Sequence, residues 1–215
     1  MEPILAADRF LFHLFNGTWT CGVLDVAMPL ITDAKLWAPL LLAAWLWLLL
    51  GADGKRRAVA LLLLVAIGAS DQLSSAVVKK AVGRKRPCCM EADARLLVPC
   101  KGSKSFPSSH AANTAAAATV IWLELGTASG IVFSLLSLAV GYSRIYIGVH
   151  YPFDVLTGWL LGVLVAWLCV WLRCRLFGRP PPAPCAHPAE RAGEGSAVAP
   201  PEREVDAETT QRGSE

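Results

Sequence analysis

The sequence contains five apolar runs that approach or exceed the length needed to cross a lipid bilayer. These runs restrict the folds that the chain can adopt more than any other feature. They cover Leu36–Leu50, Ala58–Val78, Ser108–Leu125, Ala128–Ile147 and Phe153–Leu172. Hydrophobic residues make up 54% of the chain and charged residues 17%, whereas about 25% charge is usual in a soluble globular domain. This composition excludes a disordered protein and argues against a soluble two-domain enzyme. We therefore expect an all-α, polytopic membrane helix bundle of about five transmembrane helices.

The two ends of the chain differ from this central part. Residues 3–15 predict an interfacial amphipathic helix, and residues 22–31 a second segment that is re-entrant or interfacial. Charged residues interrupt the first apolar stretch, so we expect no cleavable signal peptide. The last part is rich in Pro, Ala and Glu without periodicity, which is typical of a disordered tail. We therefore divide the chain into N-terminal interfacial segments (1–35), a transmembrane domain (36–175) and a tail (176–215).

Five spans would place the 81–107 loop, the 148–152 loop and the N-terminus on the same side of the membrane. The 52–57 loop and the tail would lie on the other side. Lys55, Arg56 and Arg57 in that short loop indicate the cytoplasmic side. The region 79–104 holds eight Lys and Arg, and these would not report orientation if they bind a ligand. We therefore expect the functional face to point outward.

Three clusters of polar residues are expected to meet at this outer face, because the alternation of the spans places all three in the connections on that side of the membrane. They are Lys79 with Arg86–Pro87, then Pro107–Ser108–Ser109–His110, then Ser143–Arg144 with His150 and Asp154. Residues so far apart in the sequence converge only if the fold brings them together.

The cations and one helix start among these residues suit a phosphate-like dianion. Lys79 offers a point charge, and Arg86 and Arg144 offer forked donors that fit phosphate oxygens. A proline at position 107 predicts a helix start, so the backbone N–H groups of Ser108 and Ser109 would point outward. Such a helix start is a favourable anion site.

Two histidines and a carboxylate supply reactive groups beside this anion site. Asp154 lies four residues after His150 in a predicted first helical turn, where it can accept the Nδ1–H of that imidazole. Nε2 of His150 would then be free to attack as a nucleophile. His110 could donate a proton to a leaving oxygen. Together these groups predict phosphoryl transfer through a phosphohistidine.

The three clusters resemble the signature of the type-2 phosphatidic acid phosphatase superfamily. Its pattern is Lys-x6-Arg-Pro, Pro-Ser-Gly-His and Ser-Arg-x5-His-x3-Asp, and this chain departs from it only at Ser109, where many members have Gly. The resemblance covers roughly residues 58–172 and implies a metal-independent hydrolase without a cofactor. It implies that His150 is the nucleophile, Asp154 its partner and His110 the acid. It also implies that phosphate is bound by Lys79, Arg86, Ser108, Ser109 and Arg144.

Elements near the N-terminus resemble the small bacterial members of this superfamily, which act on lipid phosphates. The expected partners are therefore a lipid phosphate and the membrane, and not nucleic acid. Undecaprenyl diphosphate, hydrolysed to the monophosphate, is the leading substrate, and lipid A, phosphatidylglycerol phosphate and phosphatidic acid are alternatives. The expected location is the bacterial cytoplasmic (inner) membrane with a periplasmic active site. An anion transporter or channel is the non-enzyme alternative, but it has no use for a His–Asp pair, and five spans without repeats are few for a transporter.

Two further features have alternative interpretations. Asp71 lies deep in the second apolar run, where an ionisable group is a functional candidate, but a structural hydrogen bond to a neighbouring helix is favoured. Cys100 could form a disulfide with either Cys88 or Cys89 if this face is oxidising. Zinc binding by these cysteines is the rival interpretation, and it lacks a nearby fourth ligand.

Overall fold

The computed structural model describes residues 2–100 and 102–177. The expected tail therefore lies outside the described residues, apart from Leu176 and Phe177, which end the last helix. In the described residues, every regular element is a helix and there are no strands. The α-helices are α1 (Glu2–His13), α2 (Gly22–Thr32), α3 (Ala34–Leu50), α4 (Gly54–Gln72), α5 (Lys79–Val82), α6 (Ser109–Leu125), α7 (Thr127–Tyr146) and α8 (Pro152–Phe177). This confirms the all-α class.

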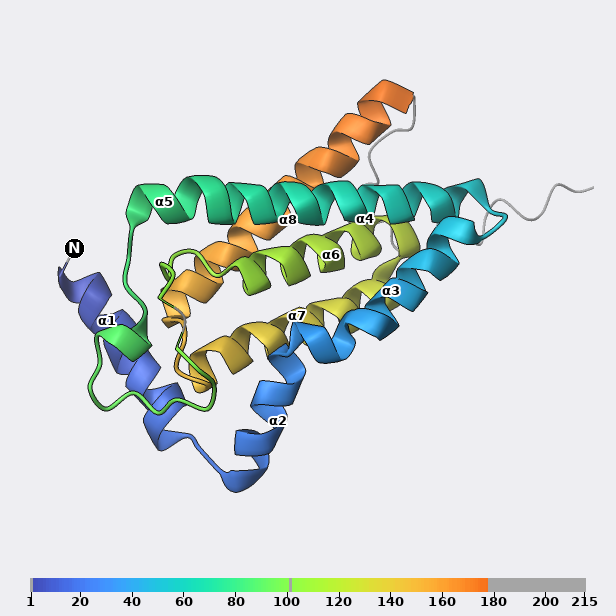
Figure 1. Cartoon of the computed structure of the whole chain (residues 1–215). Helices are drawn as coiled ribbons and strands as arrows, with labels where there is room; N and C mark the ends of the chain where they lie inside the picture. Colours follow the sequence, from blue (N-terminus) through green and yellow to red (C-terminus); the bar gives the residue numbers. More distant parts are fainter. Residues whose placement is uncertain (1, 101, 178–215) are drawn as a thin grey trace, which may run out of the picture. The chain divides into compact units, whose positions relative to one another are not determined.

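Three helical segments are long and apolar enough to cross a membrane, namely Gly54–Cys89, Thr127–Tyr146 and Pro152–Phe177. The first includes α4 and α5, which a π-helical stretch over residues 73–78 joins into the long helix seen in Figure 1. A shorter apolar helix, α3, has 17 residues. The N-terminal pair, Glu2–Thr18 and Gly22–Thr32, is bent by 117°, as in a broken span or a re-entrant loop. The expected count of five spans stays a prediction.

The central helix of the bundle is α6, which packs against α4, α7 and α8. Its inner positions are mostly alanine, so its backbone lies close to its neighbours. A Cβ atom at Gly158 or Gly162 of α8 would overlap the backbone oxygens of Ser108 and Ala112. Close approach of α8 to α6 therefore requires glycine at both positions, and it brings the starts of the two helices together.

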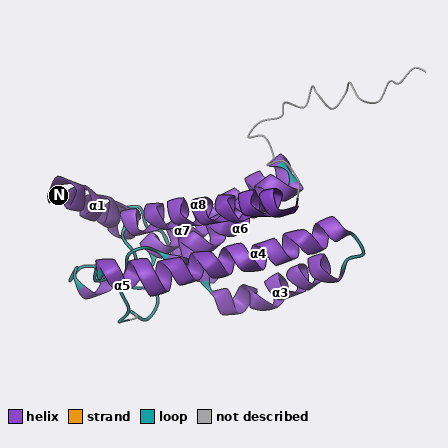
Figure 2. Ribbon diagram, turned by 90° about the horizontal axis from the view of Figure 1, so that it is seen from above, coloured by secondary structure: helices purple, strands orange, loops and turns teal. Residues whose placement is uncertain are grey.

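One end of this bundle collects the three polar clusters. The end of α5, the start of α6, the end of α7 and the start of α8 lie at the same end in Figure 1, near α1 and the loop before α6. The turn between α3 and α4 lies at the other end, and Figure 2 shows these two helices side by side. The convergence expected from the sequence is therefore present in the structure.

Candidate active site

His150 is almost fully buried in the short connection between α7 and α8. Its Nε2 atom lies 3.1 Å from Nη1 of Arg86. A guanidinium group can only donate hydrogen bonds, so Nε2 must be the acceptor and carry the lone pair. The ring proton of a neutral His150 is therefore on Nδ1. This is the tautomer that a nucleophilic Nε2 requires.

Asp154 faces the other nitrogen of this imidazole. Its Oδ2 atom lies 3.5 Å from Nδ1 of His150, and Nδ1 has no hydrogen-bond partner among the described residues. The carboxylate is fully buried in the first turn of α8, where Oδ2 accepts a hydrogen bond of 3.0 Å from the backbone N–H of Tyr151. Catalytic hydrogen bonds are often long in a free enzyme and shorten when substrate binds. The pair is thus placed for the orienting role expected from the sequence.

Burial lowers the pKa of His150 from the ordinary 6.5 to about 4. The positive charges of Arg86 and Arg144 contribute to this lowering of the pKa, whereas Asp154 acts in the opposite direction. The sequence could not show whether the carboxylate, which raises the pKa of His150, or the cations, which lower it, have the larger effect. In the folded protein, burial adds to the effect of the cations and favours the neutral ring. His150 is therefore unprotonated near neutral pH.

This lowered pKa predicts an acid sensitivity of the fold. Between pH 6.5 and about pH 4 the unfolded chain binds a proton at His150 that the folded chain does not, so stability falls as the pH falls. Between pH 7 and pH 5 we expect the loss from this residue to be about 2 kcal/mol. Thermal unfolding in detergent should show a smaller drop over this range for His150→Gln than for the unmodified protein. Equal drops would contradict the prediction.

The three cations of the site are held in different ways. Arg86 is buried and donates to the backbone oxygen of Ser103 at 3.0 Å, to its hydroxyl at 2.9 Å and to the backbone oxygen of Val149 at 3.0 Å. Lys79 donates from Nζ to the hydroxyl of Ser109 at 3.1 Å. Arg144 is buried as well, and its Nη1 donates to Thr32 at 2.9 Å. Its Nε is buried without a partner among the described residues, so it has donor capacity left for a ligand.

Ser108 differs from the sequence-based expectation. Its backbone N–H does not point outward, because it donates to the backbone oxygen of Asp154 at 2.9 Å. Its hydroxyl accepts from the N–H of Ala111 at 3.5 Å and so caps α6. The residue joins the start of α6 to the start of α8. The close packing of these two helices leaves Ser109 and His110, in the first turn of α6, as the residues of this cluster that are not fully buried.

Two residues that the sequence analysis did not assign to the site also reach it. Arg84 donates to Asp154, and Asp8 of α1 binds Arg84. In the sequence, Arg84 is one of the eight basic residues of region 79–104, and Asp8 is one of the charged residues that interrupt the first apolar stretch. An isolated acid in an apolar segment was the one available signal, because such a residue needs a partner when it is buried.

The structure bears on two of the alternatives left open by the sequence. Asp71 accepts a hydrogen bond of 2.9 Å from the side-chain amide of Asn113 on α6, so the expected hydrogen bond to a neighbouring helix is present. Cys88 forms the disulfide with Cys100, and the sulfur of Cys89 lies 3.5 Å from that of Cys100.

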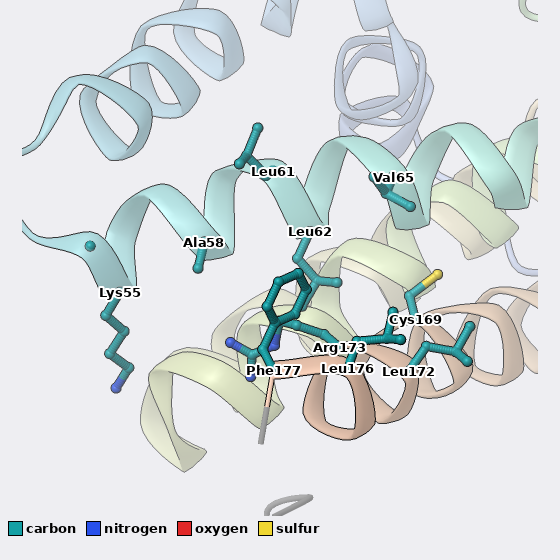
Figure 3. Close-up of a pocket in the computed structure, with 11 residues that line it drawn as sticks. Lys55, Ala58, Leu61, Leu62, Val65, Cys169, Leu172, Arg173, Leu176 and Phe177 are labelled. Carbon is teal, nitrogen blue, oxygen red and sulfur yellow. The ribbon is translucent and has the colours of Figure 1, made fainter. Parts of the chain in front are cut away.

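An apolar groove of about 630 Å³ lies between the start of α4 and the end of α8. Leucines, Ala58 and Phe177 line most of it, with Lys55 and Arg173 at its polar positions (Figure 3). Its α4 residues, from Gly54 to Val65, precede Lys79 by 14 to 25 positions, which is about 20 to 40 Å along a helix. The groove is therefore at the end of the bundle away from His150 and is not part of the candidate active site.

Comparison with known proteins relates this geometry to a family. The sequence model of the PAP2 superfamily matches residues 58–177, which include all three polar clusters. A lipid A 4'-phosphatase of Bacteroides thetaiotaomicron is 31% identical over 195 residues, which is 83% of this chain and 82% of the relative. An undecaprenyl-diphosphatase of Sulfolobus acidocaldarius is 35% identical over 94 residues, which is 44% of this chain and 46% of the relative.

Two solved structures share the fold. The crystal structure of LpxE from Aquifex aeolicus has a TM-score of 0.64 and 28% sequence identity, covering 75% of this chain and 93% of its own. The crystal structure of a transmembrane PAP2-type phosphatidylglycerolphosphate phosphatase from Bacillus subtilis has a TM-score of 0.67 and 25% identity, covering 82% of this chain and 89% of its own.

Proposed function

Since the chain belongs to the PAP2 superfamily and is an integral membrane phosphatase, we propose that it removes phosphate from a membrane lipid through a phosphohistidine on His150. The observation that carries this proposal is the environment of the imidazole. A donor-only guanidinium faces Nε2 at 3.1 Å, and a carboxylate faces Nδ1 at 3.5 Å. This combination leaves a lone pair on Nε2 and supports the positive charge that develops on the ring during attack.

In the proposed first step, Nε2 of His150 attacks phosphorus and the bond to the leaving oxygen breaks. His110 donates a proton to that oxygen, while Asp154 binds the Nδ1–H. Water then attacks the phosphohistidine, giving its proton to His110, and inorganic phosphate leaves with His150 restored. The phosphate oxygens are bound by Lys79, Arg86, Ser109 and Arg144, and Ser108 holds the helix start beside them.

Binding of phosphate must rearrange one contact seen in the free protein. Nη1 of Arg86 occupies the lone pair of His150 that attacks phosphorus. When a phosphate enters, this donor can move to a phosphate oxygen, which frees the lone pair next to its target. Arg86 would then bind the substrate and no longer donate to Nε2 of His150.

Undecaprenyl diphosphate is the first substrate that we propose. A matching relative is named for that activity, and the small size and apolar helices suit a long-chain lipid. The 4'-phosphate of lipid A is the second candidate, since a lipid A 4'-phosphatase matches 83% of this chain. Phosphatidylglycerol phosphate and phosphatidic acid are further alternatives. The relatives named above are phosphatases, which favours an enzyme over an anion transporter or channel.

We further propose the bacterial cytoplasmic (inner) membrane as the location, with the site on the periplasmic side. Lys55, Arg56 and Arg57 support this orientation because they lie in the first turn of α4, at the end of the bundle opposite the connection between α7 and α8. A short basic loop is retained on the cytoplasmic side.

The proposal is tested by phosphate release from the purified protein in mixed micelles. The panel contains undecaprenyl diphosphate, lipid A, phosphatidylglycerol phosphate and phosphatidic acid at matched surface concentration. We expect release from at least one of them, with kcat/KM highest for undecaprenyl diphosphate. A higher kcat/KM for lipid A would make lipid A, and not undecaprenyl diphosphate, the favoured substrate. No release from any of the four would contradict the function.

Metal chelation gives a further prediction. Among the described residues, the groups with metal-ligand geometry are Cys88–Cys89–Cys100 and His13–Glu91–Asp93, and neither contains the proposed reactive residues. The cations of the site already supply the positive charge that a metal ion would bring to phosphate. Phosphate release should therefore keep its full rate in excess EDTA. Complete loss that Mg²⁺ reverses would contradict the mechanism.

A further inference from the structure

Asp8 is a buried acid in a helix whose other residues are mostly exposed. Ile4, Leu5 and Phe10 of α1 are exposed, whereas Asp8 and Phe12, one turn apart, are both fully buried. One face of α1 therefore packs on the protein and carries a carboxylate into it. Burying a charge is unfavourable unless the group is paired and hydrogen-bonded, so the partners of Asp8 explain why it is there.

Those partners lead directly to the candidate active site. Oδ2 of Asp8 accepts a hydrogen bond of 2.6 Å from Nη2 of Arg84, and the other end of that guanidinium donates to Oδ1 of Asp154 at 2.8 Å. Oδ1 of Asp8 accepts the backbone N–H of Phe153 at 2.8 Å. That N–H belongs to the first turn of α8, where helix donors have no partner within the helix. Asp8 thus binds the backbone of the residue before Asp154 and, through Arg84, its side chain.

Further contacts hold both the guanidinium and the backbone of Arg84 in place. Its guanidinium lies 4.0 Å from the ring centre of Tyr151, and its backbone oxygen accepts from Ser105 at 2.8 Å. A planar fork held in this way bridges two carboxylates in one fixed geometry, whereas the rotatable ammonium of a lysine would not fix their relative position. The position of Asp154 relative to His150 is therefore determined partly from α1.

The charges of this network have a consequence for His150. If Arg84 were paired with Asp154 alone, the two charges would balance, and the carboxylate would be less able to support a positive imidazole. Because Asp8 shares the guanidinium, the three groups carry a net charge of −1 next to the ring. Asp154 then keeps negative charge for the Nδ1–H of His150 as Nε2 attacks.

We propose that Asp8 and Arg84 are positioning residues of the phosphoryl-transfer site, through which the N-terminal helix holds Asp154 in place for His150. The inference rests on the proposed function, because it assumes that His150 is the nucleophile. Asp8 lies outside residues 58–177, the part matched by the family model, and outside the three polar clusters. The N-terminal helix is thus part of the site.

The first test replaces Asp8 with asparagine, which keeps an oxygen for the Phe153 N–H but removes the charge that faces Arg84. We expect kcat to fall about 10- to 100-fold, as for a small misplacement of a reacting group, with KM within about threefold. The KM should stay nearly unchanged because the proposed phosphate-binding cations, Lys79, Arg86 and Arg144, do not contact Asp8. Asp8→Glu keeps the charge and should recover part of the loss.

Asp53→Asn is the matched control. Asp53 is an exposed acid that caps α4, accepting from the N–H of Lys55 at 2.9 Å, at the end of the bundle away from the site. This variant should keep full activity. An Asp8→Asn enzyme as active as the control would overturn the inference. Should Asp8→Asn fail to fold, Arg84→Lys replaces it, because lysine keeps the charge and loses the fork, and the same fall in kcat is expected.

A second measurement separates positioning from a merely structural role. If Asp8 acts through Asp154, Asp8→Asn should lower single-turnover ³²P transfer less than about twofold in an Asp154→Asn background. Losses that multiply would instead show that Asp8 acts elsewhere, and would overturn the inference. The proposed function is tested separately by His150→Ala. A fully active His150→Ala enzyme would refute that function, whereas an inactive one beside a normal Asp8→Asn enzyme would refute only the positioning role.

Discussion

Replacing His150 with alanine should lower phosphate release by at least about 10⁴-fold, because the proposed reaction begins with attack by its Nε2. The variant removes the atom to which phosphorus bonds, so the ³²P-labelled protein intermediate should disappear as well. Rapid acid-free quenching followed by gel analysis at alkaline pH measures the label, because phosphohistidine is stable to base and not to acid. Both losses should occur on every lipid phosphate, since the nucleophilic step is common to all of them.

His13→Ala is a matched control for this experiment. His13 is half-buried at the end of α1, where it lies 3.4 Å from Asp93 and 3.7 Å from Glu91, outside the proposed phosphate site. Its removal should leave turnover and labelling nearly unchanged. Labelling that survives in His150→Ala at the unmodified level would mean that another residue accepts the phosphate.

The His110→Ala variant should lose activity unequally on two types of substrate. An alkoxide leaving group needs a proton, whereas the phosphate that leaves a diphosphate needs one much less. A general acid contributes roughly 10²–10⁴-fold where it is needed. We therefore expect a loss of that size on a lipid monophosphate and a much smaller loss on the matched diphosphate, measured as kcat/KM at the same pH.

The comparison with His150→Ala gives this prediction its control, since that variant should damage both substrates to the same extent. Equal losses for His110→Ala on the monophosphate and the diphosphate would show that His110 positions phosphate and does not donate a proton. Ser109→Ala provides a second comparison, because its hydroxyl contacts Lys79 at 3.1 Å and has no proton-donating role in the proposed steps. Its loss should not depend on the leaving group.

Much of the fold follows from local sequence patterns. Runs of apolar residues set the long helices because a bilayer requires apolar side chains and internally satisfied backbone groups. Proline at position 152 lies at the first position of α8, and Ser108 caps α6 where the helix start was expected. The spacing within the three polar clusters is also local information. For this reason the reactive histidine, its carboxylate and the cations could be predicted before their geometry was known.

The sequence by itself thus determined the class of fold, the helix starts and the residue types of the site, because these depend on short-range periodicity and capping. Only the tertiary structure decided which groups meet across long separations. Asp8 reaches Arg84 across 76 residues, and the Ser108 N–H is taken by Asp154 of another helix. Burial, and not a neighbour in sequence, makes His150 neutral. Such pairings and the desolvation of a group arise from packing of whole helices, which no local pattern encodes.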